Sequence, residues 1–119
     1  MPNALRCVAA ACIAVALSAA AGPPQPGVRA AELCVGPVGA ALSCGAVQLE
    51  WRRNGQARLR VSDMVYTLQL KTSQVEVVLQ HGAMQIDAFD ATYEWQGDTL
   101  SFVDAAKNVR YELRRATAR

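Results

Sequence analysis

Apolar residues recur at every second position from Val47 onward, and polar residues fill most of the positions between them. A period of two gives each segment one apolar and one polar face, which is typical of half-buried antiparallel strands. Eight segments follow this pattern. Their apolar positions are Val47, Leu49 and Trp51; Ala57, Leu59 and Val61; Tyr66, Leu68 and Leu70; Val75, Val77 and Leu79; Met84 and Ile86; Tyr93 and Trp95; Leu100 and Phe102; and Val109, Tyr111 and Leu113.

Turn signals between the segments predict how neighbouring strands pair. Asn54-Gly55 invites a two-residue hairpin loop, but that register would place Trp51 opposite Arg58 on one face. A three-residue loop, residues 53–55, pairs Trp51 with Ala57 instead. Burial therefore selects the longer loop, with Gly55 in the left-handed conformation.

The later turns are read in the same way. A two-residue turn at His81-Gly82 would pair Leu79 with Met84 and Val77 with Ile86. It would make His81 a turn residue rather than a catalytic base, since histidine tolerates positive φ. A turn at Gly97-Asp98 would place Trp95 opposite Leu100 and Tyr93 opposite Phe102, and residues 105–108 would form the last loop.

These strands predict an all-β fold, a small antiparallel up-and-down barrel of eight strands with one disulfide. Closure into a barrel is the natural way for such short strands to lose their exposed edges. The apolar face holds enough large side chains to fill a barrel of this size. We therefore expect no large ligand cavity inside it.

The first third of the chain has a different composition. Residues 1–21 contain a short start with Arg6 and an unbroken run of small and apolar residues, the layout of a secretory signal peptide. Cleavage is expected after Ala21, or alternatively after Ala30. Residues 22–33, with three prolines, are expected to be a disordered mature N-terminus, and residues 34–115 to form the barrel domain.

Signal cleavage would remove two of the four cysteines and leave Cys34 and Cys44. An even pair in an exported chain predicts a disulfide. The chain holds a single histidine, His81, and the cysteine spacing is much wider than Cys-x-x-Cys, so neither a zinc site nor a redox pair is expected. Closing this loop would add about 2.5–3 kcal/mol in the loop-entropy model.

The formal net charge of +2 gives no global basic field that would favour nucleic acid. Its distribution is more informative. Arginines cluster at residues 52–60 and 110–119, whereas six acidic residues lie between Lys71 and Lys107. This distribution has two interpretations: the molecule has an acidic middle between basic ends of the chain, or the charges are ordinary solvated faces.

Catalytic motifs are poorly represented, so neither an enzyme nor a cofactor is expected. Paired carboxylates could be drawn from Asp87 and Asp90 or from Asp98 and Asp104. Asp98 lies in an expected turn, and Asp87 and Asp90 flank an expected bend, places where aspartate is common for local reasons.

Binding by a loop on a rigid barrel is the alternative to catalysis. Residues 87–92 form the longest non-alternating stretch of the second half. Asp87, Phe89, Asp90 and Thr92 of this stretch, together with Tyr93, are therefore candidate partner-binding residues. Phe89 could equally be a satellite core position.

The run from Cys44, C-G-A-V-Q-L-E-W-R-R-N-G-Q-A-R-L-R-V-S-D-M-V-Y-T-L, resembles the opening of the periplasmic and membrane-bound inhibitors of c-type lysozyme. The resemblance extends weakly to Leu113, through Tyr93, Leu100 and Phe102. It implies a small exported eight-stranded barrel that inhibits a basic lysozyme.

The chain also departs from that family. Residues 87–92 lack the serine and glycine of the family's inhibitory loop, and Ala105 stands where a lysine is expected, with Lys107 two positions on. The family's partner cysteine lies near the C-terminus, whereas here the partner is Cys34. Only Tyr93 carries over directly, and Lys107 joins the candidate list.

The sequence therefore favours a periplasmic or secreted protein that binds a protein partner, with no stable membrane insertion after signal cleavage. The expected partner is a c-type lysozyme or a similar secreted hydrolase. The alternatives are a structural or assembly component of the bacterial envelope, and a small-ligand carrier if a cavity exists.

Overall fold

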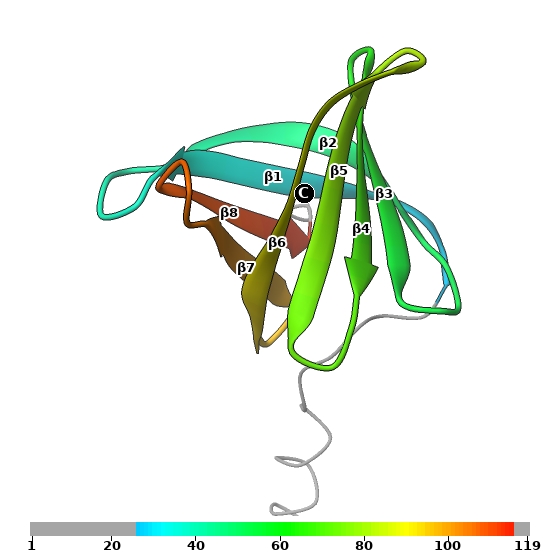
Figure 1. Ribbon diagram of the computed structural model, residues 1–119. Helices are drawn as coiled ribbons and strands as arrows, with labels where there is room; N and C mark the ends of the chain where they lie inside the picture. Colours follow the sequence, from blue (N-terminus) through cyan, green and yellow to red (C-terminus); the bar gives the residue numbers. More distant parts are fainter. Residues whose placement is uncertain (1–25, 116–119) are drawn as a thin grey trace, which may run out of the picture.

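The computed structural model describes residues 26–115, which form eight strands in a closed antiparallel barrel, each paired with its neighbours in chain order (Figure 1). The strands are β1 (Gly27–Pro37), β2 (Ser43–Trp51), β3 (Gln56–Val61), β4 (Met64–Leu70), β5 (Gln74–His81), β6 (Met84–Gln96), β7 (Thr99–Asp104) and β8 (Val109–Arg115). The predicted fold class is confirmed. Within these residues there is no helix long and apolar enough to span a membrane.

The first strand corrects the expected domain boundary. Residues 27–33, expected to be disordered, form the first part of the 11-residue strand β1. This strand pairs with both β2 and β8. Ala31 and Leu33 alternate inward and are almost completely buried. The alternation was missed because alanine is a weak apolar marker, and the prolines just before it suggested disorder. The expected signal peptide, residues 1–21, lies outside the described residues.

Strand β6 corrects a second expectation. The predicted strands around residues 84–86 and 93–95 are one continuous strand of 13 residues, so residues 87–92 lie within a strand and not in a loop. Phe89 and Ala91, two positions apart in this stretch, pack in or against the core. The expected number of strands is still correct, because the strand lost here is replaced by β1.

The β5–β6 register also differs from the prediction. Gly82, at φ +60°, and Ala83 form the turn, so His81 pairs with Met84 instead of lying in the turn. A β-bulge after Leu79 then restores the alternation and places Val77 opposite Phe89. As a result Met84 and Ile86, expected in the core, are 68% and 50% exposed.

Other predicted registers are confirmed. Trp51 lies opposite Ala57, and Gly55 has the expected left-handed conformation at φ +77°. Trp95 lies opposite Leu100 across the turn at residues 97–98. In these hairpins a single turn glycine and the burial of one face act in the same direction, so local chemistry is sufficient to determine the pairing.

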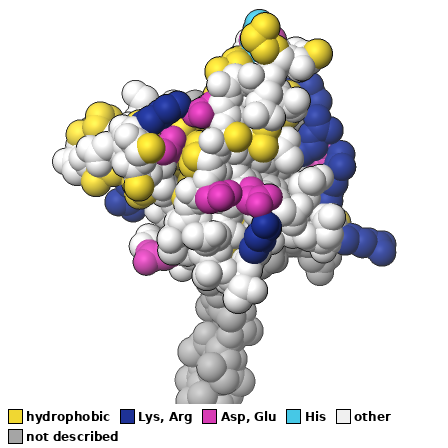
Figure 2. All heavy atoms as spheres, viewed as in Figure 1, with side chains coloured by type: hydrophobic (Ala, Val, Ile, Leu, Met, Phe, Trp, Pro, Cys, Tyr) yellow, Lys and Arg dark blue, Asp and Glu magenta, His cyan; other side chains and the backbone are white. Residues whose placement is uncertain are grey.

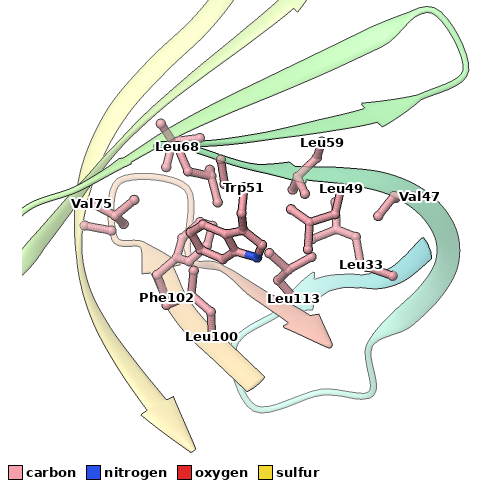
Figure 3. Close-up of a cluster of buried hydrophobic side chains, with 14 residues drawn as sticks. Leu33, Val47, Leu49, Trp51, Leu59, Leu68, Val75, Leu100, Phe102 and Leu113 are labelled. Carbon is pink, nitrogen blue, oxygen red and sulfur yellow. The ribbon is translucent and has the colours of Figure 1, made fainter. Parts of the chain in front are cut away.

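The core lies inside the barrel and is centred on Trp51 (Figure 3). Its indole ring is only 3% exposed, and the leucines of the cluster come from six of the eight strands. The labelled side chains of this cluster are Leu33, Val47, Leu49, Leu59, Leu68, Val75, Leu100, Phe102 and Leu113. Large apolar side chains thus fill the middle of the barrel as expected, but a pocket of about 360 Å³ remains at the end where Trp51, Trp95 and Arg115 lie.

The predicted disulfide joins Cys34 to Cys44. The two residues lie directly opposite each other in the β1–β2 ladder, so the bond links two strands that already pair. Cys34 is completely buried although it faces outward, because Glu112 of β8 lies beside it on the other flank. The disulfide thus lies next to the β1–β8 seam that closes the barrel.

Substitution of Leu59 by alanine tests the assignment of inner and outer faces. Leu59 is 1% exposed, so Leu59→Ala should lower the free energy of unfolding by about 2–5 kcal/mol. Ile86 is half exposed, and Ile86→Ala should change it by about 0.5 kcal/mol or less. Urea denaturation of both variants measures the difference. A larger loss from Ile86→Ala would place Ile86 in the core.

The disulfide gives a second stability prediction. The folded protein should contain no reactive thiol at Cys34 or Cys44. In the double variant Cys34→Ala with Cys44→Ala the free energy of unfolding should be about 2.5–3 kcal/mol lower, because the unfolded chain has more conformational freedom without the cross-link. Thiol titration in denaturant and urea denaturation provide the two measurements. Free thiols at both Cys34 and Cys44 would contradict the pairing.

Candidate partner-binding site

Strands β6 and β7 diverge along most of the length of β6. β5 pairs with β6 from Gln74↔Thr92 to His81↔Met84, whereas β7 pairs with β6 only from Tyr93↔Phe102 to Gln96↔Thr99. In Figure 1, β6 continues beside β5 toward the hairpin at the top, while β7 and β8 run toward β1. We call the space between residues 84–92 and residues 103–108 the wedge.

The strand divides the predicted binding residues between its two faces. Asp87, Phe89 and Tyr93 share the inward face with the buried Ala91, whereas Asp90 and Thr92 are exposed on the outer face. The expected single cluster does not exist, because consecutive residues of a strand point to opposite sides. Lys107, from the β7–β8 loop, joins the inward set.

Phe89 belongs to an aromatic cluster at the base of the wedge. Its ring lies 5.7 Å from that of Tyr111 and 6.4 Å from that of Phe102, and the rings of Phe102 and Tyr111 stack at 5.1 Å. Such pairs contribute roughly 0.5–1.5 kcal/mol each beyond their burial. Phe89 is therefore a satellite core residue, the second of the two interpretations, and it connects β6 to β7 and β8.

An ion pair spans the wedge above this cluster. The Lys107 ammonium group lies 2.5 Å from Asp87 Oδ2, while Asp87 Oδ1 accepts a hydrogen bond of 2.9 Å from the Ala88 amide. The hydrogen bond from Lys107 holds the pKa of Asp87 below its ordinary value, and the same contact raises the pKa of Lys107. Two predicted residues, far apart in sequence, are thus brought together.

The wedge interior keeps its phenols neutral. Burial raises the pKa of Tyr111 to about 12, with smaller contributions from Tyr66, Asp104 and Asp87. Burial also raises the pKa of Tyr66, whose ring meets Tyr111 edge to face at 6.2 Å. Asp104 is only 3% exposed, and it accepts a 3.4 Å hydrogen bond from the Lys107 amide. This hydrogen bond ties the β7–β8 loop to the end of β7.

Tyr93 has an internal role at the opposite end of the barrel. Its hydroxyl donates a hydrogen bond of 2.5 Å to the carbonyl oxygen of Lys71, in the β4–β5 turn. Its ring packs against the core. The one residue that carries over from the resemblance is thus held by the fold, and its hydroxyl group already has a partner.

A groove of about 470 Å³ lies on the outer side of the wedge. Asp90, Thr92 and Glu94 line its β6 wall, and Ser101, Val103, Ala105 and Arg110 line the β7–β8 wall. Arg110 forms an ion pair of 2.7 Å with Glu112, but its Nε is buried with no hydrogen-bond partner among the described residues. Sequence reasoning missed Glu94, Val103 and Arg110, because only the strand pairing brings them next to Asp90.

Acidic side chains extend from this groove onto β5. Asp90 lies opposite Glu76, and both are exposed, as is Glu94. Lys71 contacts Glu76 at 2.5 Å, which is the main reason that its pKa is raised. Figure 2 shows acidic groups near the centre of this face and basic groups along the edge where β3 lies. We call Glu76, Asp90 and Glu94 the acidic face.

Only part of the acidic run in the sequence reaches this face. Asp104 is buried, Asp87 faces the wedge, and Asp98 forms an ion pair with Arg115 at the other end of the barrel. The predicted acidic middle is therefore a smaller surface than the sequence suggested. The pleat of the strands and the closure of the barrel decide which carboxylates are presented together.

Two other clusters bear on catalysis and metal binding. His81 Nε2 lies 2.6 Å from Asp63 Oδ2, which joins the tips of two hairpins, and this contact lowers the pKa of Asp63. Glu32 lies near the sulfur atoms of Cys34 and Cys44. Because both sulfurs form the disulfide, neither is available as a thiolate ligand in this state.

Comparison of the chain with known proteins found no matching family model, no matching curated protein and no matching solved structure. The class defined by the structure is therefore a small closed β-barrel with one disulfide and an open wedge between β6 and β7. The lysozyme-inhibitor resemblance stays a prediction based on sequence.

Substitution of Lys107 by alanine should raise the pKa of Asp87 toward its ordinary value, because the Lys107 contact is the main cause of the lowering. In the native protein the ionised pair stabilises the fold above that ordinary pKa, and the contribution is lost as the pH falls through the lowered pKa. NMR titration of the Asp87 side-chain carboxyl measures the shift. Asp63, which pairs with His81, is the internal control and should titrate unchanged.

Proposed function

We propose that this chain is an exported, non-enzymatic binding protein that holds a protein partner in the wedge and on the acidic face. Its activity on this proposal is inhibition of a c-type lysozyme or a similar secreted hydrolase. The observation that carries the proposal is the groove of about 470 Å³ on the outer side of the wedge, next to exposed carboxylates on a closed barrel.

Charge complementarity supports a basic partner. Asp90 and Glu94 line the groove, and Glu76 lies beside them on β5. A cluster of one sign steers a partner of the opposite sign and sets the orientation of docking, and its effect decreases with salt. The family resemblance implies a basic lysozyme as the partner, and the acidic face has the complementary charge.

Rigid presentation supports binding by the wedge. The aromatic contacts of Phe89 and the Asp87–Lys107 ion pair hold the two walls of the wedge in place. Fewer side chains and loops have to be ordered when a partner docks on a fixed groove, and this lowers the entropic cost of association.

Export is supported by the cysteine chemistry and by the N-terminal composition. Disulfides persist in oxidising compartments, and Cys34 and Cys44 lie at disulfide distance. Residues 1–21 have the layout of a signal peptide. Cleavage after Ala21 fits the proposal better than cleavage after Ala30, because the later site would remove residues 27–30 of β1. We place the mature protein in the periplasm or outside the cell.

A second candidate is an assembly component of the bacterial envelope. It is favoured by the outward-facing Arg58 and Arg60 of β3, which lie on a different side of the molecule from the acidic face. A barrel with one acidic and one basic side could join two neighbours in a larger complex. Cross-linking in intact cells separates this candidate from a free inhibitor, since only the envelope component should be captured in a stable assembly.

Inhibition of a c-type lysozyme tests the first candidate. The mature protein should slow cell-wall lysis by the enzyme, and Asp90→Asn with Glu94→Gln should weaken inhibition by about tenfold at low salt. The matched control, Arg58→Gln with Arg60→Gln, removes two charges from the opposite side and should leave inhibition unchanged or stronger. If the protein neither inhibits the enzyme nor co-purifies with it at low salt, a c-type lysozyme is excluded as the partner.

A further inference from the structure

The pairing registers show which backbone groups of β6 face the wedge. Gln96 and Thr99 flank the two-residue turn at residues 97–98, so they are a hydrogen-bonded pair. Backbone groups of alternate residues point to the same edge of a strand. The amide and carbonyl groups of Glu94, Thr92, Asp90 and Ala88 therefore all point toward β7.

Glu94 lies opposite Ser101, and the ladder ends at the non-hydrogen-bonded pair Tyr93↔Phe102. Such a pair is flanked by backbone bonds on both sides, so the ladder engages the Thr92 carbonyl and leaves the Thr92 amide without a β7 partner. Asp90 has no opposing residue on β7 within residues 26–115. The Ala88 amide is occupied by the carboxylate of its neighbour Asp87. A stretch of β6 thus presents an unpaired strand edge to the groove.

We propose that an extended, lysine- or arginine-bearing segment of the partner adds to β6 as a strand along Ala88–Thr92. This inference concerns the mode of binding, and it rests on the proposed function only in assuming a protein partner. Main-chain hydrogen bonds to Asp90 and Thr92 would supply affinity, and side chains at alternate positions would supply specificity. The groove beside these residues provides the space.

The side chains around the edge select a basic segment. Every second residue of an added strand points outward, beside Asp90 and next to Glu76 and Glu94. Opposite charges on neighbouring strands contribute roughly 0.2–1 kcal/mol per pair. A second copy of this chain fits less well, because pairing two β6 edges would bring their aspartates together, and like charges across strands are destabilising.

Asp87 blocks one end of this edge, because its carboxylate already accepts the hydrogen bond of the Ala88 amide. The same carboxylate is held by Lys107 from across the wedge. Natural proteins protect exposed edges with inward-pointing charges, which prevents unspecific strand addition. A bound segment would pair first with Thr92 and Asp90, and would reach Ala88 by displacing the Asp87 carboxylate.

Amide hydrogen exchange on the mature protein with its disulfide intact tests the inference directly. The probe is the capped hexapeptide Lys-Thr-Lys-Val-Lys-Thr at saturating concentration. Exchange of the Asp90 and Thr92 amides should slow by about tenfold, whereas amides that already pair with β5, such as that of Phe89, should not change. Two of the matched probes are the same peptide N-methylated at its odd or at its even residues, which removes the backbone donors from one edge of the peptide strand or from the other. A third probe has glutamate in place of lysine. None of these should protect the edge.

A variant tests the backbone donor separately. Thr92→Pro removes the amide that faces the wedge and keeps every charge, and proline is tolerated at a strand edge. It should abolish protection of Asp90 by the peptide, whereas Thr92→Val, which keeps the amide, should bind as the native protein does. Should Thr92→Pro fail to fold, the N-methylated peptides make the same comparison on the native chain.

Three results would overturn the inference. The lysine peptide could shift the Asp90 and Glu94 side-chain signals without slowing any edge amide, which would indicate charge attraction alone. The N-methylated peptides could bind as well as the parent peptide. Protection could also rise with protein concentration in the absence of peptide, which would indicate pairing between copies of this chain.

The outcome is separable from that of the proposed function. Edge protection by the peptide without any lysozyme inhibition would support strand addition and reject the lysozyme. Inhibition of lysozyme with the Asp90 and Thr92 amides still exchanging freely in the complex would support the function and reject strand addition.

Discussion

The structure depends on the pairing of β1 with both β2 and β8. This one strand closes the barrel, covers the core on the side of Leu33, and carries the disulfide to β2. An open sheet of the remaining strands would leave two exposed edges and a half-covered Trp51. Closure removes those edges and allows a small domain to bury a core of this size.

The wedge follows from unequal strand lengths within that closed barrel. β6 has 13 residues and β7 has 6, so the two can pair only over part of β6. The rest of β6 keeps β5 as its neighbour, while β7 follows β8 toward β1. The Phe89 cluster and the Asp87–Lys107 pair then hold the diverging walls together. The groove and the unpaired edge are thus consequences of topology, and the side chains around them make the surface acidic.

The candidate residues illustrate how a strand distributes function. Asp87 and Asp90 are close in sequence, yet one stabilises the wedge from inside and the other is presented on the acidic face. Tyr93, two residues from Ala91, donates its hydroxyl to the carbonyl oxygen of Lys71 at the opposite end of the barrel. A partner docking at the wedge would therefore meet the outward residues Asp90, Thr92 and Glu94 and the backbone between them.

The sequence by itself determined the class of fold, the disulfide and most of the hairpins. Alternation identifies the inner face of each strand, and turn glycines such as Gly55 determine the local register, because both signals come from adjacent residues. The tertiary structure decided the rest. β1 became a strand because β2 and β8 offered two edges, and the bulge after Leu79 moved Ile86 to the surface so that Phe89 could pack inward. The wedge required the relative lengths of β6 and β7 and the closure of the barrel, and no local pattern of residues contains that information.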